Sequence, residues 1–289
     1  MSTWALLERV GDLELVARTV VHGFLAGQHR APYRGAGHDF FGHRAYQQGD
    51  ETRRIDWRLY GRSDRLFVRE YREHMNLHAY LVVDASLSMD YADPDGITKL
   101  RFAQVLAGAL AHIMLAAGDA VGLASYGRAP RMHVPARSRR GHLHDLLLEL
   151  ERLRPAGGSS AARTLELVGG VTPRRGRIVL ISDMLDDDDG AATIASLALL
   201  RARGDEVIVL RPLTRTEEGL QPLPAGAYFD PETPERTIAG SPVGYRDRIA
   251  AYYDDVGQRL RGREIEYVPL STAVPVERAL RAWLAARRA

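Results

Sequence analysis

The sequence Asp84-Ala85-Ser86-Leu87-Ser88-Met89 directly follows an apolar run, residues 77–83, that predicts a buried strand. An aspartate and two hydroxyls stand at positions i, i+2 and i+4 on a loop that leaves the end of this strand. The carboxylate supplies charge and the hydroxyls supply neutral oxygen ligands. Mg²⁺ prefers such a partial protein shell, completed by water or a bound partner. The loop therefore predicts a site for a hard divalent cation.

Strand and helix patterns alternate from residue 77 onward, which predicts the fold class. Strands are expected at 77–83, 120–126, 177–182, 206–211 and 265–269, with a hairpin partner at 131–135, and helices at 98–117, 141–153, 161–170, 190–203 and 276–288. Near-continuous apolar strands between helices indicate an α/β protein with a doubly wound, mostly parallel sheet of Rossmann type. Such sheets bind ligands beyond the carboxyl ends of their strands, where Asp84 and Asp183 are both expected.

Three segments are expected along the 289 residues. Residues 1–34 form an N-terminal helical segment with a helix at 13–25, residues 35–76 pack on the core, and residues 77–289 form the α/β domain. A proline- and glycine-rich excursion, at about 212–242, interrupts the last of these and is expected to hold a small hairpin near Tyr228 and Thr237.

The segment 35–76 mixes charges with aromatic side chains. Residues 66–73 alternate apolar and charged positions, which predicts an exposed strand. We expect Trp57 to be substantially buried as an apolar anchor, with Asp50 or Asp56 paired to a nearby arginine. A docking surface for a partner is the alternative.

Composition excludes several classes of function. The net charge of +2 gives no global drive toward nucleic acid or an anionic membrane, and 45% hydrophobic with 26% charged residues is ordinary for a soluble protein. The absence of cysteine excludes disulfides, thiolate catalysis and cysteine-based zinc sites. The first residues lack the layout of a secretory signal, and the apolar run 102–118 is shorter than a bilayer span and favours a core helix. A cytoplasmic location is expected.

Two further loops carry oxygen ligands. Gly157-Gly158-Ser159-Ser160 opens a predicted helix, and Ile181-Ser182-Asp183 ends a predicted strand. Together with Asp-x-Ser-x-Ser, this order resembles the metal-ion-dependent adhesion site of von Willebrand factor A domains. The resemblance implies that Asp84, Ser86 and Ser88 form the first metal-binding loop, Ser159 the second and Asp183 the third, around Mg²⁺ or another divalent cation. The family usually has threonine in the second loop, and Ser160 is an alternative to Ser159 here.

A block upstream narrows the resemblance. Gly49-Asp50-Glu51-Thr52-Arg53-Arg54-Ile55-Asp56-Trp57, followed by Leu66-Phe67-Val68-Arg69-Glu70-Tyr71, is similar to the hallmark of the bacterial domain-of-unknown-function 58 family, in which it precedes an A-type domain. That resemblance implies a metal-dependent protein-interaction module that works with a MoxR-type AAA ATPase in chaperone-like or complex-assembly activity. The expected partner is this ATPase or another protein that offers an acidic residue, and no enzymatic activity is expected, for the reasons that follow.

Two enzyme classes are alternatives. One is a metal-dependent, phosphatase-like hydrolase of the haloacid dehalogenase type. Such an enzyme needs a second carboxylate at the position that Ser86 occupies. It also needs a lysine to bind phosphate, and Lys99 is the only lysine in the sequence. Serine-based hydrolysis is disfavoured because no Gly-x-Ser-x-Gly elbow is present and no motif places a histidine near Ser86. A stretch of basic residues without an acid is expected to be a solvated edge of the fold. The alternative is a binding site for phosphate or for an acidic partner. The stretch comprises Arg128, Arg131, Arg137, Arg139 and Arg140.

Overall fold

The chain divides into two compact units in the computed structural model. One unit is Pro32–Asn76, and the other joins Met1–Ala31 to Leu77–Ala289. The structure describes residues 12–26, 39–72, 77–94, 96–127, 129–158, 161–185, 189–219, 228–229, 237–238 and 245–287. The predicted packing of residues 35–76 on the rest of the chain stays a prediction.

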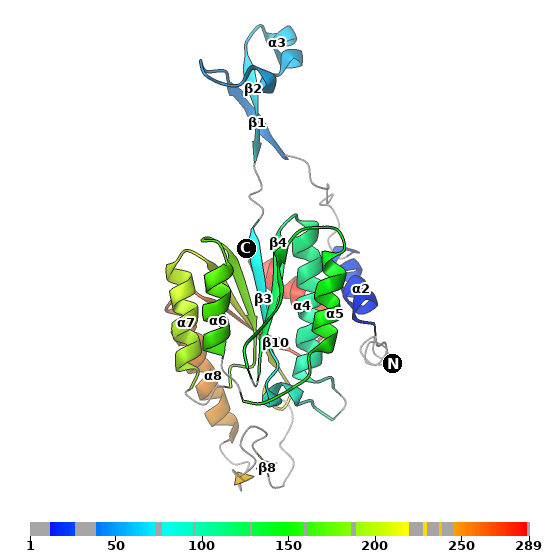
Figure 1. The fold of residues 1–289 in the computed structure, drawn as a ribbon, viewed down its shortest axis with the longest axis vertical. Coiled ribbons are helices and arrows are strands. Elements are labelled where there is room, and N and C mark those ends of the chain that lie inside the picture. The colour runs from blue at the N-terminus through cyan, green and yellow to red at the C-terminus, as the bar shows by residue number, and fades with distance from the viewer. Residues whose placement is uncertain are drawn as a thin grey trace. The chain divides into compact units, whose positions relative to one another are not determined.

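A six-stranded sheet forms the centre of the larger unit (Figure 1). Its strands lie in the order β10 (Glu266–Ser271), β7 (Glu206–Leu213), β6 (Arg177–Ile181), β3 (His78–Asp84), β4 (Ala120–Tyr126) and β5 (Arg131–Arg137). Only β5 is antiparallel to its neighbour. All but the first residue of β3 are buried, as expected of a strand covered on both faces. The predicted doubly wound, mostly parallel sheet is confirmed.

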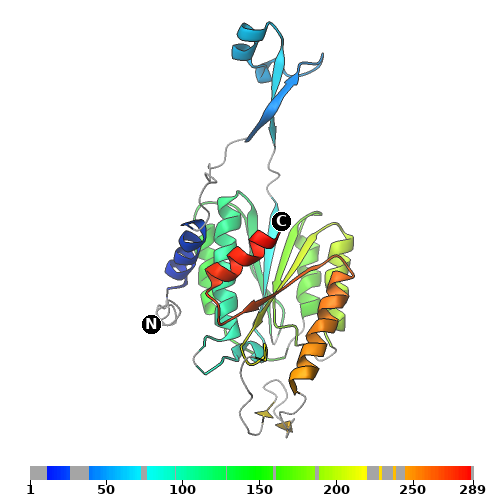
Figure 2. The ribbon, with the colours of Figure 1, turned by 180° about the vertical axis from the view of Figure 1, so that it is seen from behind.

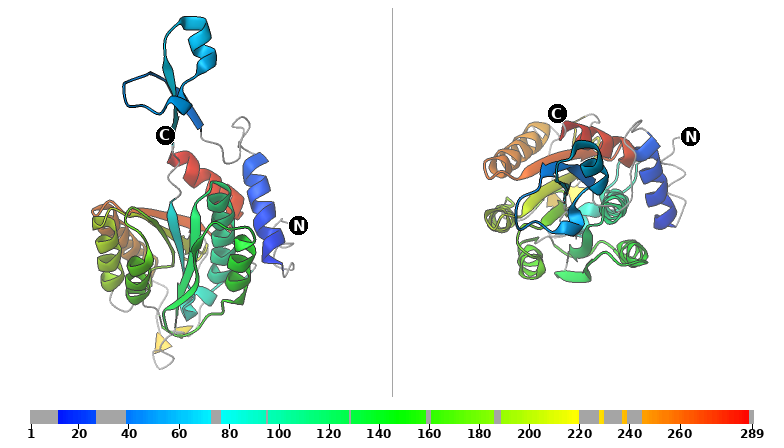
Figure 3. Two further views of the ribbon diagram at one scale, coloured as in Figure 1. Left: turned by 45° about the horizontal axis from the view of Figure 1, so that its top comes forward. Right: turned by 90° about the horizontal axis from the view of Figure 1, so that it is seen from above.

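Helices cover both faces of this sheet (Figures 1, 2 and 3). One face carries α2 (Leu13–Ala26), α4 (Lys99–Ala116), α5 (His142–Arg152) and α9 (Val276–Ala286), and the other carries α6 (Ala161–Val171), α7 (Ala191–Ala202) and α8 (Tyr245–Arg261). Successive side chains of a strand point to opposite faces, so β3 contributes Leu81 and Val83 to one apolar core and Tyr80 and Val82 to the other.

The helix α4 confirms the expected core helix. Among the described residues it alone is long and apolar enough to cross a membrane, but 72% of it is buried inside the fold. Its N-cap is Thr98, whose hydroxyl accepts the N–H of Arg101 at 3.1 Å. This cap begins α4 at Lys99, whose side chain reaches Asp183 beyond the end of β6.

The smaller unit pairs β1 (Asp39–Ala45) with β2 (Phe67–Arg72) in an antiparallel ladder. The short helix α3 (Trp57–Ser63) begins after Asp56, whose Oδ1 accepts the N–H groups of Arg58 and Leu59. Asp50 pairs with Arg44 at 2.8 Å, which confirms the predicted ion pair.

The smaller unit by itself does not bury Trp57, so the expectation of a buried anchor is wrong within this unit. Its side chain is 60% exposed, and α3 buries none of its residues. The indole makes a T-shaped contact with the ring of Tyr60, while Ile55 and Val68 are buried apolar side chains among the described residues of this unit. Asp56 caps α3 and pairs with His43 at 3.0 Å, so polar contacts fix the helix in place of an indole anchor.

Most predicted elements of the larger unit occur within about two residues of their expected bounds, and the small hairpin is present as β8 (Tyr228–Phe229) and β9 (Thr237–Ile238). Among the described residues, five elements were not predicted: β1, α3, α8 and the 3-10 helices η1 (Thr52–Arg54) and η2 (Leu87–Asp90).

Gly122 in β4 is required by the packing of a neighbouring side chain. A Cβ at this position would lie 2.3 Å from Cε1 of Tyr80, and Tyr80 is held because its hydroxyl accepts the N–H of Ala136 at 3.2 Å. We expect Gly122→Ala to lower the free energy of unfolding by about 1–3 kcal/mol, measured by urea denaturation. The matched control is Gly170→Ala in α6, where a Cβ meets nothing within 4 Å and the change should be neutral or stabilising. Equal stabilities for both variants would contradict the argument.

Candidate functional site

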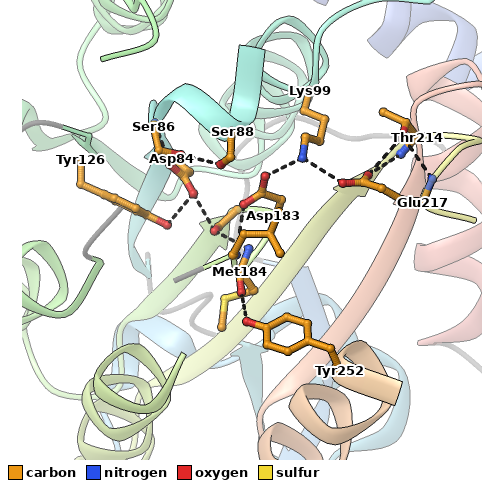
Figure 4. A network of polar contacts seen from close by, with 12 residues as sticks. Asp84, Ser86, Ser88, Lys99, Tyr126, Asp183, Met184, Thr214, Glu217 and Tyr252 are labelled. Carbon is orange, nitrogen blue, oxygen red and sulfur yellow. Dashed lines mark hydrogen bonds and ion pairs between the residues drawn. The ribbon is translucent and has the colours of Figure 1, made fainter. Parts of the chain in front are cut away.

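Asp84 is the last residue of β3 and is fully buried (Figure 4). Its Oδ1 accepts the N–H of Ser86 at 2.9 Å, which turns the loop that follows the strand. Its Oδ2 accepts the hydroxyls of Tyr126 at 3.0 Å and Ser182 at 2.8 Å. The carboxylate is therefore fixed from β3, from the end of β4 and from the loop after β6.

Three more predicted ligands lie beside it. The hydroxyls of Ser86 and Ser88 are 3.0 Å apart, at the start of the 3-10 helix η2 (Leu87–Asp90). Asp183 is fully buried two residues after β6, the strand next to β3. The structure thus brings Asp84, Ser86, Ser88 and Asp183 together at the carboxyl edge of the sheet (Figure 4). Ser159 and its alternative Ser160 lie outside the described residues.

Burial and the neighbouring Asp183 both disfavour the charged form of Asp84. Burial, and next the negative charge of Asp183, raise the pKa of the Asp84 carboxyl to about 7, although the hydrogen bonds from Ser86 and Ser182 oppose the shift. Without a metal ion, the charged form of this carboxyl is therefore costly.

Lys99 was not predicted as part of the site. Its Nζ donates to Oδ2 of Asp183 at 2.6 Å and to Oε1 of Glu217 at 3.0 Å, and its side chain is 2% exposed. Burial alone would lower the pKa of Lys99, but the two carboxylates outweigh it and hold the pKa above its ordinary value. The ammonium therefore stays positively charged, and it forms ion pairs with the carboxylates of Asp183 and Glu217.

The turn after β7 positions Glu217. Its Oε2 accepts the N–H of Thr214 at 2.8 Å, and Asp93 accepts the N–H of Arg215 at 2.7 Å and the hydroxyl of Thr216 at 2.8 Å. Asp93 lies on the segment that joins η2 to α4, so the loops after β3 and β7 are tied together on both sides of Lys99.

These residues fit a hard divalent cation. Among the described residues no group of three or more histidine, cysteine or acidic side chains has the geometry to hold a metal, so the protein would supply two carboxylates, with hydroxyls and water completing the shell. Mg²⁺ accepts such an oxygen-rich and partly solvated shell. Burial and the charge of Asp183 raise the pKa of Asp84, and a cation bound beside the two carboxylates would oppose both effects.

Comparison with known proteins identifies the family. Protein of unknown function DUF58 matches residues 42–255, which is most of the chain, and the chain therefore belongs to this family. Similar curated proteins include uncharacterized protein Rv1480 of Mycobacterium tuberculosis and uncharacterized protein Mb1516 of Mycobacterium bovis, each 32% identical over 176 residues. The match covers 60% of this chain and 55% of each relative, so the chain spans about half the length of the curated relatives it matches.

Solved structures support the fold. The conserved hypothetical protein BatB from Bacteroides thetaiotaomicron has a TM-score of 0.50 at 16% identity, over 73% of this chain and 98% of that protein. A von Willebrand factor type A protein from Catenulispora acidiphila is also similar, with a TM-score of 0.38 at 18% identity, over 47% and 33%. The larger unit, with its doubly wound sheet, has a von Willebrand factor A-like fold.

The pKa of Asp84 predicts how stability depends on pH without metal. The folded protein keeps this proton to about pH 7, whereas the unfolded chain releases it near pH 3.8. The contribution of Asp84 is therefore fully present below about pH 4 and is lost as the pH rises through about 7. In EDTA, we expect Asp84→Asn to gain stability relative to the unsubstituted protein between pH 5 and pH 8, measured as the difference in melting temperature. Glu166→Gln, on the exposed side of α6, is the control. A difference that stays constant over this range would contradict the assigned shift.

Removing the ammonium of Lys99 should be costly. Lys99→Met leaves Asp183 and Glu217 buried without their counter-charge, and we expect a loss of about 3–5 kcal/mol in the free energy of unfolding. The double variant Lys99→Met/Glu217→Gln should lose less, because one uncompensated charge is gone. Denaturant titrations of both variants measure the coupling, and strictly additive losses would argue against the ion pair.

Proposed function

We propose that this member of the DUF58 family is a metal-dependent protein-interaction module that works with a MoxR-type AAA ATPase, in chaperone-like or complex-assembly activity in the cytoplasm. The observation that carries the metal dependence is the pair of buried carboxylates flanked by two serine hydroxyls at the carboxyl edge of the sheet. The resemblance recognised in the sequence supports the choice of partner.

The proposed ligands are Asp84, Ser86, Ser88, Asp183 and, from the resemblance, Ser159. A bound Mg²⁺ would supply an electrophilic position that a carboxylate of the partner fills. Tyr126 and Ser182 orient Asp84 toward the loop serines, and Lys99 balances one of the carboxylates next to it.

The charges of the site make binding conditional on the metal. Asp84, Asp183 and Glu217 oppose the single ammonium of Lys99, so two negative charges remain uncompensated when all three carboxylates are ionised. These charges equal the charge of one divalent cation. An acidic side chain is repelled by the metal-free site and accepted by the loaded one.

The alternative, a metal-dependent phosphatase-like hydrolase, has less support. Lys99 is bound by two carboxylates, and a hydroxyl stands at position 86 where a second acid would be needed.

The test is binding of the full chain to a purified MoxR-type ATPase from the same organism. We expect retention on the immobilised ATPase in Mg²⁺, loss in EDTA and recovery when Mg²⁺ is restored. Asp84→Ala should remove binding while circular dichroism shows a folded chain, and the exposed Glu166→Ala should bind normally. Binding that is equally tight in EDTA, or unchanged in Asp84→Ala, would show that no metal at this site mediates the contact.

A further inference from the structure

A second cluster of reactive side chains lies on the opposite side of β4 from the Tyr126 ring. Ser125 is the penultimate residue of β4, His133 lies in the middle of β5, and Glu149 lies in α5. The Oγ of Ser125 is 2.6 Å from Nε2 of His133, and Nδ1 of His133 is 3.2 Å from Oε2 of Glu149. Serine, histidine and carboxylate thus form an unbroken hydrogen-bonded chain across three elements.

The partners of His133 fix its tautomer. An ionised Glu149 can only accept, so the proton of the neutral imidazole lies on Nδ1 and Nε2 accepts the hydroxyl proton of Ser125. Burial lowers the pKa of His133 in spite of Glu149, so the ring is neutral at neutral pH. A neutral ring that already accepts the serine proton, oriented by a carboxylate, is the arrangement that activates a serine nucleophile.

A cavity gives access to this chain. Ser125, His133 and Glu149 line a cavity of about 630 Å³ whose wall also includes Ala85 and Tyr126. It lies at the carboxyl edge of the sheet, where α/β folds bind their ligands. Its volume is in the range of small-molecule sites. The side chain of Arg152 on the same wall is 71% exposed, so the cavity reaches the surface.

The charge of the wall indicates the class of ligand. Arg131, Arg152 and Arg154 line the cavity against the single acid Glu149, which is itself bound by His133 and Arg152. The guanidinium of Arg152 is committed to Glu149 at 2.6 Å, and that of Arg154 to backbone carbonyl groups, whereas Arg131 has an exposed side chain. The potential in the cavity favours a substrate with an anionic group.

We propose that Ser125, His133 and Glu149 are a nucleophilic triad that hydrolyses small carboxylic esters, with preference for an acyl group that carries a carboxylate. Oγ of Ser125 forms a bond to the acyl carbon while Nε2 of His133 takes its proton. The ester C–O bond breaks, and the same proton passes to the departing alcohol. Water then cleaves the acyl-serine, giving up a proton through His133 to Ser125, and the carboxylic acid leaves. Glu149 holds the ring and stabilises its protonated form throughout.

The first test is covalent labelling of the full chain by a fluorophosphonate, in EDTA so that the metal site plays no part. The serine oxygen displaces fluoride from phosphorus, and mass spectrometry should locate the adduct on Ser125. Labelling should disappear in Ser125→Ala and remain in Ser138→Ala, which removes an exposed serine of the neighbouring loop.

Glu149→Gln keeps the shape of the side chain and should slow labelling at least about tenfold, with circular dichroism as the check of folding. The absence of an adduct on Ser125, or labelling that is equally fast in His133→Gln, would reduce the cluster to a structural tie between β4, β5 and α5.

The second test addresses the substrate. The 4-nitrophenyl monoester of glutaric acid should be hydrolysed at least about tenfold faster than 4-nitrophenyl acetate. A hydrogen-bonded contact between its free carboxylate and a guanidinium is strong enough to produce a rate difference of about tenfold. The ratio of the two rates should fall toward one in Arg131→Ala. Equal rates for the two esters would overturn the substrate class, and turnover that persists in Ser125→Ala would overturn the triad.

Discussion

Two carboxylates buried side by side, Asp84 and Asp183, are the constraint around which the larger unit is arranged. Parallel strands deliver both to one edge, because β3 and β6 are neighbours and end together. Their mutual repulsion in a medium of low dielectric would destabilise the fold without nearby compensation. Hydroxyl groups from β4 and from the loop after β6 hold one carboxylate, and the ammonium of Lys99 neutralises the other. Glu217 in turn balances Lys99, which extends the network to the loop after β7.

Backbone contacts at the end of β4 separate this negative edge from the positively lined cavity. Ala85 accepts the N–H of Ala156 and donates to the carbonyl of Tyr126, and Gly127 fits between these segments. A Cβ on Gly127 would lie 2.5 Å from the carbonyl oxygen of Ala156 and 2.7 Å from that of Ala85, so only glycine is accommodated there. Tyr126 contributes to both sides, since its hydroxyl bonds to Asp84 while the residue lines the cavity. Two regions of opposite charge therefore share one rigid wall.

The fold of the larger unit was predictable because its strands are apolar on both faces, a pattern that few other arrangements satisfy. The helix α8 escaped prediction because it covers the edge of the sheet with only a few buried apolar side chains, among them Val256 and Leu260, in a largely polar sequence. In the smaller unit the charged, aromatic and glycine-rich segment has no hydrophobic period that would predict β1 or α3. The exposure of Trp57 shows why burial cannot be assigned from residue type alone: a side chain on the outer face of a seven-residue helix has few neighbours to cover it.

The candidate site divides along similar lines. Asp84, Ser86 and Ser88 are predictable as neighbours because three oxygen-bearing side chains lie within five residues at a strand end, and local sequence alone brings them together. Lys99 carried a weaker signal, as the single lysine of the chain at the start of an apolar helix, and its partners Asp183 and Glu217 are 84 and 118 residues away. Ser125, His133 and Glu149 carried none, because no motif spaces them and the geometry arises only when β5 folds back beside β4 and α5 packs over both. The contact between these three side chains depends on the antiparallel pairing of β5 with β4 and on the packing of α5, so it can be found only in the folded structure.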